Sequence, residues 1–118
     1  MLIKAECEAR KGNTTTAADL LNTLRQKRFK PADYVALTAS TNDEALQLVI
    51  NERRRELFQK GLRWFDLKRL NKDEHFRKML KRNYQGQEIV LEPTSNRYAL
   101  PIPGKVILLN PKIEQNPR

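Results

Sequence analysis

The segment 51–70, which reads NERRRELFQKGLRWFDLKRL, constrains the fold of this chain more than any other stretch. A charged helical segment runs up to Gly61 and an amphipathic segment follows it, so the pattern predicts two helices joined by a sharp corner. Charged side chains stand among large apolar ones on both sides of this corner: Arg53, Glu56, Arg63 and Asp66. An ion among apolar neighbours is costly unless it is paired, so these four residues are the candidate site.

Two interpretations of this candidate site remain open. The four residues could bind a polar or anionic ligand, or they could form a buried ion-pair network that fixes the corner at Gly61. Bidentate contacts between Arg and a carboxylate suit the packing role, so we favour the network. One sequence does not identify which Arg pairs with which carboxylate.

Residues 1–29 predict a helical hairpin of the tetratricopeptide type. A short helix over 2–11 ends at Gly12 and Asn13, and a second helix, capped by Thr16, fades before Pro31. Small residues on the first helix would let the second approach closely. No second copy of this unit follows, so a repeat array is not expected.

Residues 41–82 predict further helices after a linker at 30–40. Thr41 and Glu44 have the spacing of a capping box, which starts the longest helix, and this helix is expected to end at Gly61. Asp73 is expected to cap another short helix that carries Phe76, Met79 and Leu80.

Residues 87–118 predict a small β-hairpin and an irregular, proline-rich tail. Apolar and polar residues alternate over 88–92 and again over 97–100, and the turn-forming residues 93–96 separate these two runs. At most one helical turn is expected in the tail, over 105–109. The fold class is therefore mainly α, in a single region 1–118.

The residue types needed for catalysis or metal binding are sparse. His75 stands among charged residues without an obvious partner and is expected on the surface. Cys7 is the single cysteine, which excludes an internal disulfide, and its neighbours predict a small residue packed between helices. The glycines are isolated, so no phosphate-binding loop is present. We therefore expect no enzyme, no catalytic residue, no metal site and no cofactor.

The formal net charge of +9 raises nucleic acid as a partner. However, the basic residues are spread along the chain, and the run 53–55 points around three sides of a helix, which does not form a binding stripe. A basic helical nucleic-acid-binding module is therefore the alternative reading. Four aromatic residues could stack on a sugar ring, although Trp64 is expected in the core. They are Tyr34, Trp64, Tyr84 and Tyr98.

Three ordered stretches resemble the C-terminal part of the SusD/RagB family. They are the hairpin sequence LIKAECEARKGN…AADLLNTLRQKR, the segment INERRRELFQKGLRWFDLKRLN and the tail NRYALPIPGKVILLNPKIEQNPR. The second resembles the family pattern ER-x-x-EL-x-x-EG-x-R-x-x-DL, and the tail resembles PIP…NP…QNP. Lys60 departs from the usual glutamate before the glycine, and Lys105-Val106 depart from an acidic residue that often follows PIP.

The resemblance implies a surface lipoprotein of a Gram-negative outer membrane that captures glycans or other nutrients. It also implies a TonB-dependent outer-membrane transporter as the partner of the full-length protein, which a lipid anchor would hold at the cell surface. Because Met1 falls inside a family helix, we expect a soluble C-terminal scaffold fragment that could self-associate. Its matched motifs are scaffold motifs, so the ligand-binding residues are unknown, and the loops 30–40 and 82–87 are the expected source of ligand contacts. A purely structural protein–protein scaffold is a third reading.

Overall fold

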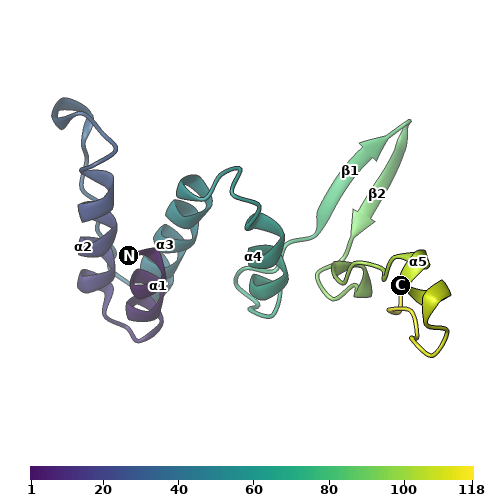
Figure 1. The fold of residues 1–118 in the computed structure, drawn as a ribbon. Helices are drawn as coiled ribbons and strands as arrows, with labels where there is room; N and C mark the ends of the chain where they lie inside the picture. The colour runs from purple at the N-terminus through teal and green to yellow at the C-terminus, as the bar shows by residue number, and fades with distance from the viewer. The chain divides into compact units, whose positions relative to one another are not determined.

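A computed structural model describes all 118 residues, and the chain is mainly helical, as the sequence predicts. It divides into two compact units, Met1–Arg63 and Trp64–Arg118 (Figure 1). The elements, in chain order, are the helices α1 (Leu2–Arg10) and α2 (Thr14–Arg25), the 3-10 turn η1 (Pro31–Asp33), the helices α3 (Asn42–Glu56) and α4 (Arg63–Leu70), the strands β1 (Leu80–Tyr84) and β2 (Gln87–Leu91), the 3-10 turn η2 (Asn96–Tyr98) and the helix α5 (Gly104–Leu109).

The first unit is built around three helices, α1, α2 and α3, each of which contacts the other two (Figure 1). Small residues on α1 and α2 are almost fully buried: Ala5 and Ala9 on α1 and Ala17 on α2 have almost no exposed surface. Leu21 and Val49 are the largest fully buried side chains. Small buried side chains let neighbouring helices pack closely, as the predicted hairpin of α1 and α2 requires.

The turn between α1 and α2 corrects one predicted cap. Gly12 adopts the left-handed conformation at φ +89°, as expected for a glycine after a helix. Helix α2 then begins at Thr14, with Asn13 before it, so Thr16 lies inside the helix and caps nothing. Before the helix, the Asn13 side chain donates to Glu8 Oε2 at 2.7 Å across the turn.

The start of α3 agrees with the prediction, whereas its end does not. The Thr41 side chain accepts from the Glu44 backbone N–H at 3.2 Å, and the Glu44 carboxylate accepts from the Thr41 N–H, which completes the capping box. The helix was expected to reach Gly61 but ends at Glu56. Gln59 and Gly61 both have positive φ, at 58° and 71°, so the backbone leaves the helical conformation before the glycine.

The second unit contains a hairpin at a different place from the predicted one. Strands β1 and β2 pair antiparallel, with Leu80 opposite Leu91 and Tyr84 opposite Gln87. The two loop residues, Gln85 and Gly86, have φ values of 49° and 79°. Two consecutive positive φ angles match the twist of a two-residue hairpin loop, which explains why the chain reverses here.

Two predicted elements of this unit are therefore wrong. Asp73 begins a turn in place of a helix: its side chain accepts from the His75 N–H, and Leu80 already belongs to a strand. The segment 93–98 is not a hairpin loop but a turn followed by η2, in which Ser95 Oγ accepts from the Arg97 N–H.

The tail folds back on itself through two amide side chains. Gln115 accepts from the Ile102 N–H at 2.8 Å and donates to the Ile102 carbonyl at 3.0 Å. Asn116 donates to the Leu100 carbonyl at 2.7 Å. These bonds satisfy backbone groups in a segment where prolines prevent regular pairing. At most one helical turn was expected over 105–109, and the structure has the six-residue helix α5 there, which is longer than one turn.

None of the helices combines the length and the apolar character that crossing a bilayer requires.

We predict that Leu21→Ala lowers the free energy of unfolding by about 2–5 kcal/mol, because the change leaves a cavity between α2 and its neighbours. Leu21 is 1% exposed, whereas Leu108 is 79% exposed, so Leu108→Ala is a matched control with almost no cost. Urea unfolding followed by circular dichroism measures both variants. Equal losses in the two would contradict the core described above.

Candidate functional site

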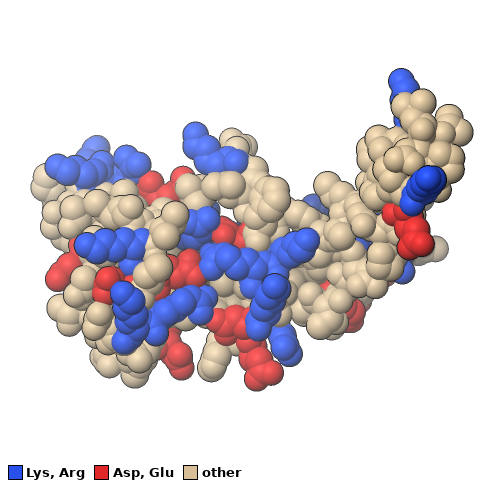
Figure 2. Space-filling model, turned by 60° about the horizontal axis from the view of Figure 1, so that its bottom comes forward, with Lys and Arg blue, Asp and Glu red and all other residues tan.

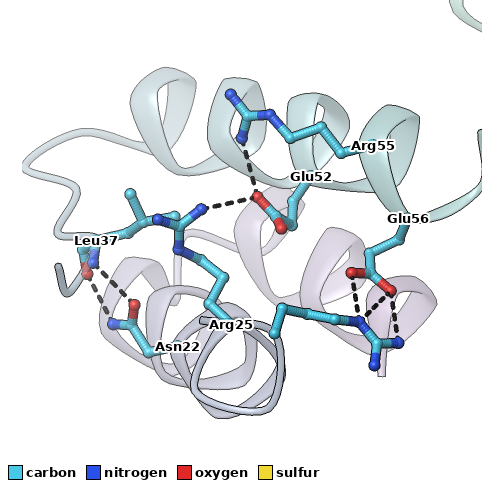
Figure 3. A network of polar contacts seen from close by, with 7 residues as sticks. Asn22, Arg25, Leu37, Glu52, Arg55 and Glu56 are labelled. Atoms are coloured by element: carbon cyan, nitrogen blue, oxygen red, sulfur yellow. Dashed lines mark hydrogen bonds and ion pairs between the residues drawn. The ribbon is translucent and has the colours of Figure 1, made fainter. Parts of the chain in front are cut away.

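The most buried carboxylate in the first unit belongs to Glu52 of α3, whose side chain is 4% exposed. Its Oε2 atom accepts from Arg25 Nη1 at 3.2 Å and from Arg55 Nη1 at 2.9 Å (Figure 3). Arg25 lies on α2 and is itself 12% exposed at the side chain. A buried carboxylate is tolerated because two guanidinium groups replace the water it has lost. The contact therefore joins α2 to α3.

Arg25 is further held by an aromatic ring. Its guanidinium carbon lies 4.6 Å from the ring centre of Phe29, which follows α2 in the chain. A cation over an aromatic face is attracted by the negative charge of the ring face. Arg25 Nε, in contrast, is buried without a hydrogen-bond partner. The arginine is thus fixed from two directions while one of its donors stays unsatisfied.

A second ion pair joins the end of α3 to the segment after α2. Arg28 Nε donates to both oxygens of Glu56, at 2.9 and 3.2 Å, and Arg28 Nη2 donates to Oε2 at 3.0 Å. The hydrogen bonds from Arg28 lower the pKa of Glu56 from its ordinary value of 4.5; desolvation opposes this shift, and the charge of Arg28 adds to it. The same hydrogen bonds raise the pKa of Arg28. Glu56 is therefore a structural anion.

The linker 30–40 is anchored to α2 at one point. Asn22 Nδ2 donates to the Leu37 carbonyl at 2.8 Å, and the Leu37 N–H donates to Asn22 Oδ1 at 2.8 Å (Figure 3). The amide side chain thereby pairs with the linker backbone as a strand would. Earlier in the linker, Val35 is 70% exposed. That this loop supplies ligand contacts stays a prediction.

Two of the four residues predicted as the candidate site have contacts that can be described, both with arginines outside the predicted set. Glu56 pairs with Arg28, and Asp66, which is buried, accepts from Arg69 Nη2 at 3.1 Å within α4. Arg53 and Arg63 are half-buried. The network expected across Gly61 stays a prediction.

The sequence analysis did not identify three residues that form ion pairs in the first unit, namely Arg25, Arg28 and Glu52. A helical-period signal was present for Glu52, which lies three residues after the buried Val49 and so on the same face of α3. No comparable signal existed for Arg25, which lies far from Glu52 in the sequence.

The aromatic residues of the second unit lie in different surroundings. The rings of Trp64 and Tyr98 have centres 4.9 Å apart, and Trp64 Nε1 donates to the Tyr98 carbonyl at 3.2 Å. Tyr98 is buried and Trp64 is half-buried, so this pair packs the second unit. Tyr84 next to the hairpin loop is 63% exposed.

An open hollow of about 620 Å³ lies on the first unit, beside the end of α3. It is lined by Asn51, Arg54, Arg55 and Phe58. All four are exposed, and Phe58 is 73% exposed, which is unusual for a large aromatic side chain. Two guanidinium groups, an amide and an aromatic ring thus meet in one concave surface.

The residues considered for other chemistry do not gather into a site. No group of three or more His, Cys, Asp or Glu side chains could hold a metal ion. His75 is exposed, as expected. Cys7 was expected to pack between helices but is exposed, because the buried face of α1 is formed by Ala5, Glu6 and Ala9.

Comparison with known proteins identifies the relatives of this chain. The model of the SusD family matches residues 1–118. The SusD-like protein P38 of Formosa agariphila is 32% identical over 127 residues. This match covers 98% of the present chain and 22% of the length of that curated relative. No solved structure matches the chain.

We predict that Glu52→Ala lowers the free energy of unfolding by about 3 kcal/mol, because it leaves Arg25 buried without a carboxylate. Glu88→Ala is the matched control: the Lys81–Glu88 distance of 3.0 Å lies between the 2.9 and 3.2 Å of the two Glu52 contacts, but its side chains are 55% and 57% exposed. Its loss is expected to be at most about 1 kcal/mol. Chemical unfolding measures both, and a Glu52→Ala variant no less stable than Glu88→Ala would refute the buried role.

The lowered pKa of Glu56 predicts an acid-sensitive contribution to stability. A carboxylate whose pKa is lower in the folded chain than in the unfolded chain stabilises the fold at pH values above the unfolded pKa of 4.5. This stabilisation is lost as the pH falls through the pKa of the folded chain. The stability difference between the parent chain and Glu56→Gln should therefore be constant near neutral pH and shrink below about pH 4.5. Arg28→Gln should behave in the same way. Thermal unfolding across pH measures the difference, and one that persists into strong acid would contradict the assignment.

Proposed function

The chain belongs to the SusD family, and on that premise we propose that it forms part of a non-enzymatic protein that binds glycans for uptake across an outer membrane. Members of this family are generally non-catalytic binding proteins. The observation that carries the proposal is the family match over residues 1–118.

The framework role of the matched motif supports this proposal. The carboxylates of Glu52 and Glu56 form ion pairs with arginines of the same unit. In the tail, the amide side chains of Gln115 and Asn116 form hydrogen bonds with backbone groups. Motif residues used in this way hold the fold, which leaves ligand recognition to side chains outside the motif.

The location and the partner follow from the same premise. We infer a lipid-anchored protein at the cell surface that works with a TonB-dependent outer-membrane transporter. The chain spans 22% of its curated relative, so this activity belongs to the whole protein. Affinity capture of such a transporter by the full-length protein would support this partner.

The charge of the chain provides the competing reading, a nucleic-acid-binding module. On the face drawn in Figure 2, Lys and Arg side chains are interspersed with Asp and Glu and with uncharged surface. A backbone-tracking protein would place its basic residues in a continuous stripe or groove. The mixed charge on this face therefore gives the nucleic-acid reading no support there.

Affinity electrophoresis against a panel of neutral and acidic polysaccharides, with duplex and single-stranded DNA in parallel, tests the proposal. We expect at least one polysaccharide to retard the full-length protein at about 0.15 M salt more strongly than either DNA does. The nucleic-acid reading predicts the opposite ranking, with DNA retention that falls steeply as salt is added. DNA binding without polysaccharide binding would overturn the proposed function.

A further inference from the structure

The hollow beside the end of α3, lined by Asn51, Arg54, Arg55 and Phe58, contains uncommitted recognition groups. The Arg54 side chain makes no hydrogen bond or ion pair within the chain, and it is exposed. Asn51 Oδ1 accepts from Gln47 Nε2 at 3.1 Å, which leaves the Asn51 amide donor available. The framework therefore does not use these groups fully.

Arg55, one of the two arginines of the hollow, is held in position by its ion pair with the buried Glu52. Arg55 donates through Nη1 to Glu52, whose carboxylate is already paired with Arg25. The other donors of Arg55 remain available because its side chain is 63% exposed. A guanidinium held at one end loses less conformational entropy on binding a ligand than a free one. The hollow thus offers a preorganised cation next to a free one.

The nearby acidic groups do not cancel this positive charge. Glu52 is paired with Arg25 and Arg55, and its side chain is 4% exposed. Glu56 is paired with Arg28, whose hydrogen bonds lower the pKa of the carboxyl group. Arg54 has no carboxylate of its own, so the hollow attracts an anion.

We propose that this hollow binds an acidic sugar residue, with Arg54 and Arg55 contacting its carboxylate or sulfate group and Phe58 lying against the apolar face of the ring. Guanidinium groups form charge-assisted, often bidentate bonds with planar carboxylates and bind other oxyanions. An exposed aromatic ring offers a flat apolar surface, and Asn51 adds an amide donor for a hydroxyl. This inference rests on the proposed function and adds the class of glycan: a polysaccharide carrying uronate or sulfate.

Of the four lining residues, only Arg55 takes part in the ion pairs that hold the first unit together. Arg54 and Phe58 can therefore be replaced without removing a described contact of the fold. This separation makes the inference testable apart from stability.

The test uses the 118-residue chain and isothermal titration with three probes: an oligogalacturonate, its neutral methyl ester and a sulfated galactan oligosaccharide. The variants are Arg54→Gln and Phe58→Ala. Arg97→Gln removes the same charge elsewhere, and Phe65→Ala removes a 67% exposed phenylalanine outside the hollow. Circular dichroism and thermal unfolding should be unchanged in all four.

We expect the chain to bind at least one acidic probe more tightly than the methyl ester, and the uronate and sulfate probes identify which anion is preferred. Arg54→Gln should weaken this binding about tenfold, since it removes a charge-assisted hydrogen bond. Phe58→Ala should weaken it for both acidic and neutral sugars, and the two controls should change it less than twofold, by roughly the scatter expected of remote sites.

Other results would overturn the inference in distinguishable ways. Acidic-sugar binding that survives both Arg54→Gln and Phe58→Ala would place the site elsewhere and leave the proposed function intact. Equal binding of the ester and the acid would exclude the acidic class. Single-stranded DNA is titrated as a fourth probe, and if it bound through Arg54 and Phe58 more tightly than any sugar, the hollow would be a nucleic-acid site. If none of the three saccharides bound, the inference would be overturned, and the polysaccharide panel with the full-length protein would decide the proposed function separately.

Discussion

A carboxylate with almost no contact with water stands where α3 meets α2. Glu52 is 3% exposed, and the arginines that surround it come from two helices, Arg25 from α2 and Arg55 from α3 itself. A buried ion pair is a demanding contact, because removing either partner leaves an uncompensated charge. The packing of the first unit therefore depends on α2 and α3 holding one register, and the alanine contacts of α1 complete that arrangement.

The buried Glu52 carboxylate also connects the core of the first unit to its surface. Glu52 holds Arg55 from below, and Arg55 lines the hollow together with Arg54 and Phe58. The buried side of α3 is thus used for folding, while the side chains of Arg54 and Phe58 at the hollow take part in none of the ion pairs of the first unit.

The sequence predicted contacts between residues that lie close together along the chain, and it did not predict contacts between residues far apart. The capping box at Thr41 was readable because its partner lies three residues away. The hairpin was placed around 93–96 because proline and asparagine outweighed the pair Gln85-Gly86, whose positive φ angles determine the turn. The partners of Glu52 and Glu56 were missed because Arg25 and Arg28 lie 27 and 28 residues away, and only the packing of α2 on α3 brings them together.

A double-mutant cycle between Arg25 and Glu52 tests the central claim most directly. Each residue is replaced by alanine singly and then together, and the free energies of unfolding are compared. If the two side chains stabilise the unit as a pair, the double variant should lose less than the sum of the single losses, with a coupling of roughly 0.5–3 kcal/mol. Losses that add without coupling would contradict the account, because the two side chains would then act independently.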